Sequence, residues 1–191
     1  MKALVLSASP NEDGLTAACA QAAKEGLLAG GLNVEQVNLN KLNIGSCAAC
    51  DRGWGTCRTE QRCQVEDDFQ ALHERTYQTD ALVIVTPVYW WEMSESAKAF
   101  TDRVRRCEAI HKTESRLLDI PMIMVAAAGG SGNGTISCLA SMERWIQHVR
   151  GDRFDMISVN RWTRDYKILT IEAAGKALAI QLLAKTTKPE K

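Results

Sequence analysis

The opening of the chain changes its hydrophobic pattern in a way that predicts three successive elements. Residues 3–6 form a short apolar run, and small and turn-forming residues follow at 7–14. Apolar residues then recur at helical spacing, and one face of the pattern contains Leu15, Ala18, Cys19 and Ala22. A continuous run, a break and then a helical period are typical of a buried strand, a tight loop and a helix N-terminus.

The rest of the chain alternates predicted strands and helices. Alternating apolar and polar residues at 32–39 favour a half-buried or edge strand. Continuous apolar runs at 80–86 and 120–128 are typical of strands covered on both faces, and a fifth strand is predicted at 154–159. Further helices are predicted after a cap at Asp67–Asp68, from near Ser94, at 135–149 and at 170–185.

This alternation predicts a single α/β domain over residues 1–191. Its five-stranded sheet is expected to be parallel and doubly wound, with helices on both faces. Residues 43–66 interrupt the pattern after the second strand, because they contain four cysteines, three glycines and little periodicity. We expect a long functional loop there, and a fraying polar tail at 186–191.

Composition narrows the class of protein. Of the 191 residues 46% are hydrophobic, which suits one globular domain with a substantial core. Lys plus Arg and Asp plus Glu number 23 each, so no basic surplus indicates a nucleic acid or an anionic membrane as partner. No apolar run approaches the ~20 residues that cross a bilayer, and the sequence starts with a strand rather than a signal peptide. We therefore expect a cytoplasmic protein.

Three loops are expected to meet at one edge of the sheet, since ligands of such sheets bind beyond the carboxyl ends of the strands. The loop at 7–16 precedes a helix N-terminus, whose N–H groups and dipole can hold an anion. Ser7, Ser9 and Thr16 add hydroxyl donors there. The same residues could equally serve only as helix caps.

The other two loops have unusual compositions. Residues 87–93 contain three consecutive aromatics, Tyr89, Trp90 and Trp91, and residues 129–134 contain four glycines. Glycine lets a backbone pass close to a ligand. An anion site, an aromatic wall and a glycine strip together favour a phosphorylated planar ligand. The alternative for the two tryptophans is packing at a subunit interface, where Trp is enriched.

Three segments carry motifs of a known family. Residues 8–16 read A-S-P-N-E-D-G-L-T, close to G-S-P-R-x-x-G-N-T. Residues 86–94 read T-P-V-Y-W-W-E-M-S and residues 98–103 read K-A-F-T-D-R, close to T-P-x-Y…S…K-x-F-x-D-R. Residues 63–69 read C-Q-V-E-D-D-F, close to C-x-x-x-D-D followed by Met or Phe. The chain thus resembles the NADPH-dependent FMN reductase and iron–sulfur flavoprotein family, which implies a three-layer flavodoxin-like fold with strand order 2-1-3-4-5.

The resemblance implies three groups of residues around FMN. Its phosphate would be held by Ser9, Asn11, Thr16 and Ala17. Its isoalloxazine ring would be lined by Pro87, Val88, Tyr89 and Trp90. Its pyrimidine side would be closed by Gly129, Gly130 and Ser131. Asn11 and Leu15 stand where the family has Arg and Asn, which predicts a phosphate held more weakly or by other donors.

The resemblance also implies the chemistry. NADPH or NADH would pass hydride to the flavin, and the reduced flavin would pass electrons to a small acceptor such as a quinone, a free flavin, an azo compound or a metal compound. Such an enzyme needs positioning rather than an acid–base pair, so we expect His73, His111 and His148 to be surface or packing residues. Lys98, Asp102 and Arg103 match the family too, and we expect the last two to brace a neighbouring loop.

Two other classes of function stay open at this point. One is an electron carrier between proteins, and the other is a metal-binding or cofactor-free regulatory module. A neutral net charge favours the enzyme over the carrier. By resemblance alone we expect a homodimer or a homotetramer.

The loop at 43–66 carries its own alternatives. Its thiols, Cys47, Cys50, Cys57 and Cys63, resemble the C-x2-C-x2-C-x5-C that binds a [4Fe–4S] cluster in iron–sulfur flavoproteins, but with a middle gap of six residues. The four could bind a cluster, bind zinc, or remain unliganded thiols that pack or react at a dimer contact. The other three cysteines, Cys19, Cys107 and Cys138, fall on apolar helix faces and are expected to be small buried residues.

Overall fold

A five-stranded parallel sheet runs through the middle of the molecule in the computed structural model, which describes residues 1–109 and 115–187. The strands lie in the order β2 (Asn33–Asn38), β1 (Lys2–Ser7), β3 (Ala81–Tyr89), β5 (Pro121–Ala128) and β6 (Asp152–Asn160). A two-residue strand, β4 (Glu92–Met93), pairs antiparallel with the end of β3. Counted along the parallel strands this is the order 2-1-3-4-5, so the flavodoxin-like prediction is confirmed.

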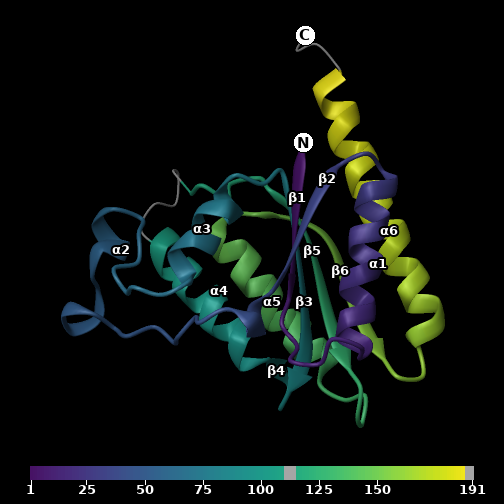
Figure 1. Cartoon of the computed structure of the whole chain (residues 1–191), viewed down its shortest axis with the longest axis horizontal. Helices are drawn as coiled ribbons and strands as arrows, with labels where there is room; N and C mark the ends of the chain where they lie inside the picture. The colour runs from purple at the N-terminus through teal and green to yellow at the C-terminus, as the bar shows by residue number, and fades with distance from the viewer. Residues whose placement is uncertain (110–114, 188–191) are drawn as a thin grey trace.

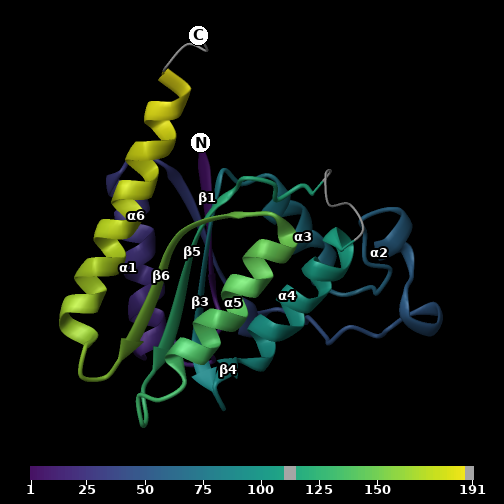
Figure 2. The ribbon, with the colours of Figure 1, turned by 180° about the vertical axis from the view of Figure 1, so that it is seen from behind.

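Helices cover both faces of the sheet (Figures 1 and 2). One face carries α1 (Leu15–Ala29) and α6 (Arg164–Thr187), which lie side by side. The other carries α3 (Phe69–Tyr77), α4 (Glu95–Glu108) and α5 (Thr135–Val149). Residues 43–66, which we call the cysteine segment, extend outward beyond α3 and α4 and contain η2 (Asp51–Gly53) and α2 (Thr56–Thr59). A short 3-10 turn, η1 (Leu39–Lys41), precedes this segment. Within the described residues no helix combines the length and apolarity needed to cross a membrane.

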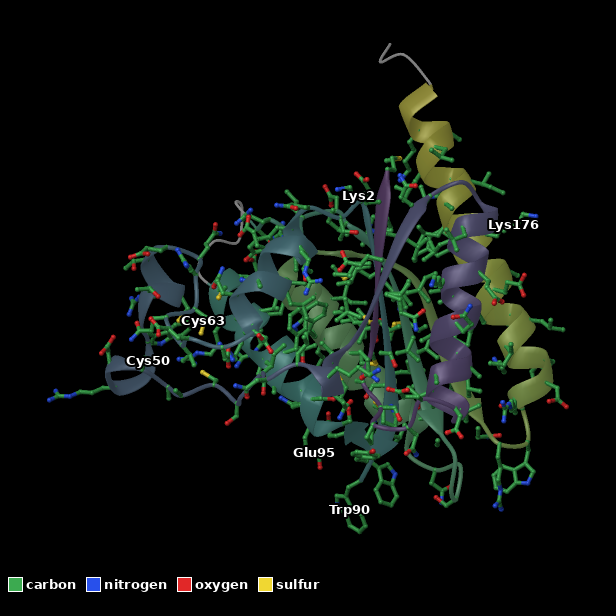
Figure 3. The ribbon with its side chains drawn as sticks, in the orientation of Figure 1. Lys2, Cys50, Cys63, Trp90, Glu95 and Lys176 are labelled. Atoms are coloured by element: carbon green, nitrogen blue, oxygen red, sulfur yellow. The ribbon has the colours of Figure 1, made fainter. Side chains whose placement is uncertain are left out.

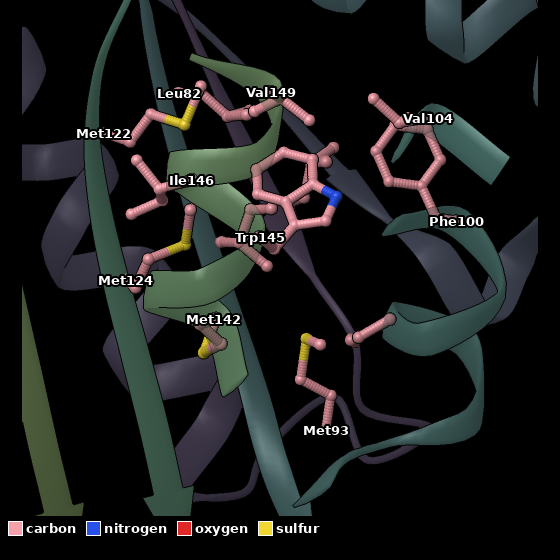
Figure 4. Packing of buried hydrophobic residues seen from close by; sticks show 14 of the residues in the cluster. Leu82, Met93, Phe100, Val104, Met122, Met124, Met142, Trp145, Ile146 and Val149 are labelled. Carbon is pink, nitrogen blue, oxygen red and sulfur yellow. The ribbon is translucent and has the colours of Figure 1, made fainter. Parts of the chain in front are cut away.

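The apolar runs form two cores, one on each side of the sheet. All of β5 is buried, as expected for a strand covered on both faces, whereas β2 is partly exposed at the edge. In the core under α4 and α5 the Trp145 ring packs among methionine and leucine side chains (Figure 4). Its indole N–H donates to the carbonyl of Thr101 at 2.8 Å, so the polar atom of this buried ring is satisfied and α5 is fixed to α4.

Several predicted boundaries shift for physical reasons. β3 runs on to Tyr89, beyond the predicted end at 86, because its last two residues pair with β4. The last helix begins at Arg164 rather than 170, and it reaches Thr187, inside the segment predicted to fray. Asp67 rather than the N-cap residue caps α3, since its Oδ1 accepts the Phe69 N–H at 3.0 Å. The predicted helix at 135–149 has the bounds of α5.

Candidate functional site

The loop after β1 places hydrogen-bond donors at the carboxyl edge of the sheet. Gly14 precedes α1 without a side-chain cap, and the Ala18 N–H makes the first helical hydrogen bond, to the Gly14 carbonyl at 3.0 Å. The N–H groups of Leu15, Thr16 and Ala17 therefore have no acceptor among the described residues. Such donors at a helix N-terminus attract an anion.

Side-chain hydroxyls complete this turn. Ser9 is buried, and its Oγ accepts the Asn11 N–H at 3.2 Å while its carbonyl accepts a hydrogen bond from the Asn38 side chain at 3.1 Å. Thr16 is equally buried, and its hydroxyl makes no hydrogen bond within the described part of the chain. The donor set, three N–H groups and hydroxyls at one helix end, fits the chemistry of a phosphate.

Buried hydroxyls tie this loop to the end of β3. The Ser94 Oγ donates to the Ala8 carbonyl at 2.9 Å, and the Ser94 N–H donates to the Thr86 Oγ1 at 3.0 Å. Both side chains are inaccessible to solvent, so the bonds are shielded from water. The sequence motif contained these two residues without giving them a role. They fix the phosphate-type loop relative to the aromatic segment.

Two tryptophans form the turn of the β3–β4 hairpin. Tyr89 pairs with Glu92, which leaves Trp90 and Trp91 as the two turn residues, with φ of 49° and 66°. Turns of this kind favour Asn and Gly, because a left-handed conformation costs other residues about 1–2 kcal/mol each. Trp90 is 88% exposed and projects from the tip of the hairpin away from the sheet (Figure 3). Its ring meets that of Trp91 edge-on at 5.2 Å between centroids.

The glycine-rich loop after β5 lies between two tryptophans. A Cβ on Gly134 would come within 2.9 Å of the Trp91 backbone, and a Cβ on Gly132 would come within 2.5 Å of the Trp162 ring. A Cβ on either of the first two glycines of the loop would meet no atom within 4 Å, so that end of the loop borders open space. Sequence reasoning missed Trp162, which lies in no motif and in no periodic run.

Adjacent strands thus bring the predicted flavin residues to one edge of the sheet, which we call the rim. The carboxyl ends of β1, β3 and β5 carry Ser9, Asn11, Thr16, Ala17, Pro87, Val88, Tyr89, Trp90, Gly129, Gly130 and Ser131. A phosphate-type turn, an aromatic hairpin and an open glycine strip lie along this edge, which fits a phosphorylated planar group. The ring of Trp90 stands apart from the others because it points into solvent.

The four cysteines of residues 43–66 surround a second feature, beside α4 rather than at the rim (Figure 3). They line one small cavity of about 20 Å³ together with two arginines of α4. We call this the cysteine cavity; its side chains include Cys47, Cys50, Cys57, Cys63, Arg103 and Arg106. Cys57 and Cys63 pack against the core under α4 and α5. Cys47 is exposed at the start of residues 47–53, which we call the outer turn.

Arg103 anchors the cysteine segment to α4. Its guanidinium is 1% exposed and makes two hydrogen bonds to the Asp67 carboxylate, at 2.5 and 2.9 Å. It also donates to the Gly45 carbonyl at 3.1 Å and to the Cys63 Sγ at 3.3 Å, and it stacks on the Phe69 ring. Burial by itself would raise the pKa of Asp67, but hydrogen bonds led by those from Arg103 hold it below its usual value. The predicted bracing role is confirmed for Arg103.

Asp102 behaves differently from the prediction. It faces the surface of α4, where it pairs with Lys98 at 2.5 Å and lies 3.8 Å from Arg105. It therefore braces no loop. The reason is helical geometry, because consecutive residues on α4 point in directions about 100° apart.

The residue types that line the cysteine cavity suit a metal site, but the distances between them do not. Four thiols and two guanidiniums suit an anionic thiolate centre. Among residues 1–109 and 115–187, however, no three His, Cys, Asp or Glu side chains are close enough to hold a metal ion. The outer turn would have to move its thiols toward Cys57 and Cys63 for all four to bind.

The remaining thiols and the described histidines join no cluster that could hold a metal ion. Cys19, Cys107 and Cys138 are buried as predicted, and burial raises the pKa of Cys19 and Cys138 to about 12. His73 is fully buried between Phe69 and Tyr77, and neither ring nitrogen has a hydrogen-bond partner among residues 1–109 and 115–187. Burial, followed by the charges of two arginines, lowers its pKa to about 3. His148 is on the surface, and His111 lies outside the described residues.

Comparison with known proteins finds relatives whose names combine an iron–sulfur centre with a flavin. The chain is 31% identical over 104 residues to an iron–sulfur flavoprotein of Archaeoglobus fulgidus, a match that covers 54% of this chain and 46% of that protein. It is 26% identical over 156 residues to an iron–sulfur flavoprotein of Methanosarcina thermophila, covering 79% of this chain and 75% of that one. The first match thus spans less than half the length of its relative.

Solved structures support the fold, and a family model supports the family. An NAD(P)H:quinone oxidoreductase from Methanothermobacter marburgensis superimposes with a TM-score of 0.74 at 21% identity, over 93% of this chain and 96% of that one. At that identity the likeness shows the fold alone. The family model described as NADPH-dependent FMN reductase matches residues 1–162. The chain therefore belongs to the NADPH-dependent FMN reductase family.

Proposed function

We propose that this protein is an FMN-dependent NAD(P)H oxidoreductase that passes electrons from a nicotinamide to a small acceptor at the rim. The observation that carries the proposal is the set of unpartnered N–H donors in the first turn of α1, fixed by buried hydroxyls beside an aromatic hairpin. Family membership supports the choice of FMN as the group held there.

The loop after β1 would hold the FMN phosphate. The N–H groups of Thr16 and Ala17, the hydroxyls of Ser9 and Thr16, and the side chain of Asn11 are the donors at this turn. Backbone donors need no positive side chain, so the Asn11 that replaces the family's Arg leaves most of the site in place. We expect the charge lost at this position to weaken the site rather than abolish it.

The hairpin and the glycine strip would position the ring. Pro87 and Val88 are half-buried at the end of β3, and Tyr89 is 40% exposed beside them. Gly129 and Gly130 leave room for a flat group, with Ser131 following them. When bound, FMN would supply the hydride-accepting and electron-donating chemistry. The chain's part is to hold the ring where a nicotinamide and then an acceptor can stack on it.

The acceptor class and the assembly belong to this proposal. An open rim lined by exposed aromatics suits flat acceptors such as quinones, free flavins and azo compounds. The exposed rings of Trp90 and Trp162 support a homodimer or homotetramer in which a second copy covers the rim. All seven cysteines are unbridged thiols, which supports a reducing, cytoplasmic location.

The test is binding and turnover with a matched pair of variants. Quenching of flavin fluorescence measures FMN affinity, and NADPH or NADH consumption with a quinone measures turnover. We expect Thr16→Ala to weaken FMN binding by about tenfold, the loss of one hydrogen bond to a charged group. Thr170→Ala, an exposed threonine of α6, is the control and should bind like the parent. A parent chain that binds no FMN would contradict the proposal.

A second candidate is an iron–sulfur flavoprotein that carries electrons between partners. The specific observation in its favour is that all four thiols of residues 43–66 line one cavity. Absorbance, iron and sulfide content of anaerobically purified protein test it, independently of FMN. About four iron atoms per chain are expected for the cluster. Zinc in their place, or no metal, would contradict it.

A further inference from the structure

Two arginines of α4, the buried Arg103 and the half-buried Arg106, line the cysteine cavity beside the four thiols. Arg103 and Arg106 lie three residues apart on one helix face, and both line the cysteine cavity. The Nε of each is buried and has no hydrogen-bond partner among the described residues. A buried N–H without an acceptor costs about 1–3 kcal/mol, so two of them at one cavity indicate a missing acceptor.

The two arginines are held in place by different contacts. Arg103 is fixed by Asp67 and already donates to the Cys63 Sγ at 3.3 Å. Arg106 stacks on the Trp54 ring, 4.0 Å from its centroid, and no carboxylate among the described residues pairs with it. The charge of Arg103 is thus offset by Asp67, while no carboxylate in the described part of the chain offsets that of Arg106.

A four-thiolate centre would supply the hydrogen-bond acceptors and the negative charge that the two arginines lack. Four thiolates carry four negative charges, so a centre with either Zn²⁺ or an oxidised [4Fe–4S] core of charge +2 has a net charge of −2. Placing such a charge in a half-buried cavity is costly unless hydrogen bonds and positive charges compensate it. Thiolate sulfurs accept N–H hydrogen bonds, and arginine is suited to give them while staying charged.

We infer that Arg103 and Arg106 are positioning residues of a thiolate metal centre formed by Cys47, Cys50, Cys57 and Cys63. Arg103 holds Cys63 and the core side of the loop, and Arg106 supplies the uncompensated charge. This inference rests on the part of the second candidate function that places a metal centre at the four thiols, whether iron–sulfur or zinc, and it is independent of FMN at the rim.

The charge of a guanidinium beside a cluster has a measurable effect that a purely structural role lacks. A cluster gains one negative charge on reduction, and a nearby guanidinium stabilises the reduced form more than the oxidised form. Removing that charge should therefore lower the reduction potential, while a packing defect would change stability without a defined direction in the potential.

The experiment compares three substitutions on α4 after anaerobic reconstitution with iron and sulfide. Arg106→Gln removes the charge, and Arg106→Lys keeps it. Arg105→Gln is the control, because this neighbour loses the same charge from the outer face of the helix, where it lies 3.8 Å from Asp102. Iron per chain, circular dichroism and a redox titration followed by electron paramagnetic resonance are measured for each.

We expect Arg106→Gln to lower the potential by about 59 mV, a tenfold shift in the one-electron equilibrium. Arg106→Lys should recover most of that shift, and Arg105→Gln should change it little. Arg103→Lys is added as a fourth variant. It keeps the charge but loses the forked contact with Asp67, so we expect it to lower iron content more than it lowers the potential.

The possible results distinguish failure of the metal centre from failure of the role given to the arginines. A parent chain that loads neither iron nor zinc would overturn the centre itself, and with it this inference. A parent that loads a cluster, with Arg106→Gln folded and unchanged in both iron content and potential, would overturn the role of the arginines alone. If zinc loads instead, competition with a chromophoric chelator replaces the titration. Arg106→Gln must then bind zinc about tenfold more weakly, and equal affinity would overturn the role.

Discussion

The rim and the cysteine cavity belong to one sheet but are held to it by different kinds of contact. At the rim, neutral hydroxyls buried between β1 and β3 join one backbone segment to another, as in the bonds of Ser94 to Ala8 and Thr86. At the cysteine cavity, one charged side chain, Arg103, joins α4 to a loop through Asp67. The rim is therefore an extension of the sheet, whereas the cavity is joined to α4 through the one ion pair that is buried in the described part of the chain.

This difference explains where each region can tolerate strain. The rim can hold two tryptophans in left-handed conformations because paired strands on both sides determine the turn. The outer turn of the cysteine segment is also left-handed, at Ala49, Asp51 and Arg52, but no sheet flanks it. We expect the rim to keep its shape without ligand and the cavity to change its shape when a metal binds.

Cutting the single anchor should produce the largest effect. Asp67→Ala leaves the Arg103 guanidinium buried without its carboxylate, which we expect to cost about 3–5 kcal/mol of unfolding free energy. Urea denaturation measures the loss. The loop should also become more sensitive to protease than the rim.

A matched control separates this ion pair from pairs in general. Asp102→Ala removes an exposed pair with Lys98 on the same helix, and should cost at most about 1 kcal/mol. Equal losses for the two variants would show that the cavity does not depend on one anchor.

Lowering the pH should destabilise the protein through α3, because this helix contains the buried His73. Its pKa is about 3 when folded, lowered from 6.5 by burial and then by Arg116 and Arg103. The unfolded chain takes up this proton near pH 6.5 and the folded chain only near pH 3. Its contribution to stability is therefore complete above pH 6.5 and is lost as the pH falls toward 3, by about 2 kcal/mol between pH 7 and 5.

Replacing the ring isolates that contribution. His73→Phe keeps an aromatic ring between Phe69 and Tyr77 and removes two nitrogens that have no partner. We expect it to stabilise the protein at pH 7 and to flatten the dependence of stability on pH. Urea unfolding at several pH values, compared with the parent, gives the difference. An unchanged slope would show that His73 is not the group that titrates.

The same contrast separates what the sequence could predict from what it could not. The sheet and its carboxyl edge follow from local pattern, as the uninterrupted apolar run of β5 shows. The loops of the rim come directly after such strands, so their meeting followed from strand order. Trp162 was missed because a single exposed aromatic carries no periodic signal.

The cavity depends on contacts between distant residues. Asp67 and Arg103 are 36 residues apart, and only folding shows that they meet. The motif suggested a brace made by both Arg103 and Asp102, but helical geometry points Asp102 elsewhere. The Trp90–Trp91 turn escaped prediction for the opposite reason, because its residues contradict the usual Asn-Gly preference of such turns.

Relieving the strain at the rim should have a smaller effect, and of opposite sign. Trp90→Asn together with Trp91→Gly supplies the residues that left-handed turn positions favour, and we expect a gain of about 1–2 kcal/mol. FMN binding should weaken in the same variant if the hairpin lines the ring. Trp162→Asn, at a position that is not left-handed, is the control and should not stabilise. A loss of stability in the double variant would show that packing against Gly134 outweighs the strain.

The smallest effect is expected from loosening one tie of the rim. Ser94→Ala removes the bond to the Ala8 carbonyl and the cap of α4, at a cost of about 1 kcal/mol, because other sheet contacts remain. FMN affinity should fall by about threefold, since the phosphate-type loop loses one of its supports. Thr170→Ala, the exposed threonine of α6, should again leave the affinity unchanged. If Ser94→Ala were as damaging as Asp67→Ala, the rim would depend on a single contact just as the cavity does, and the two regions would not differ in kind.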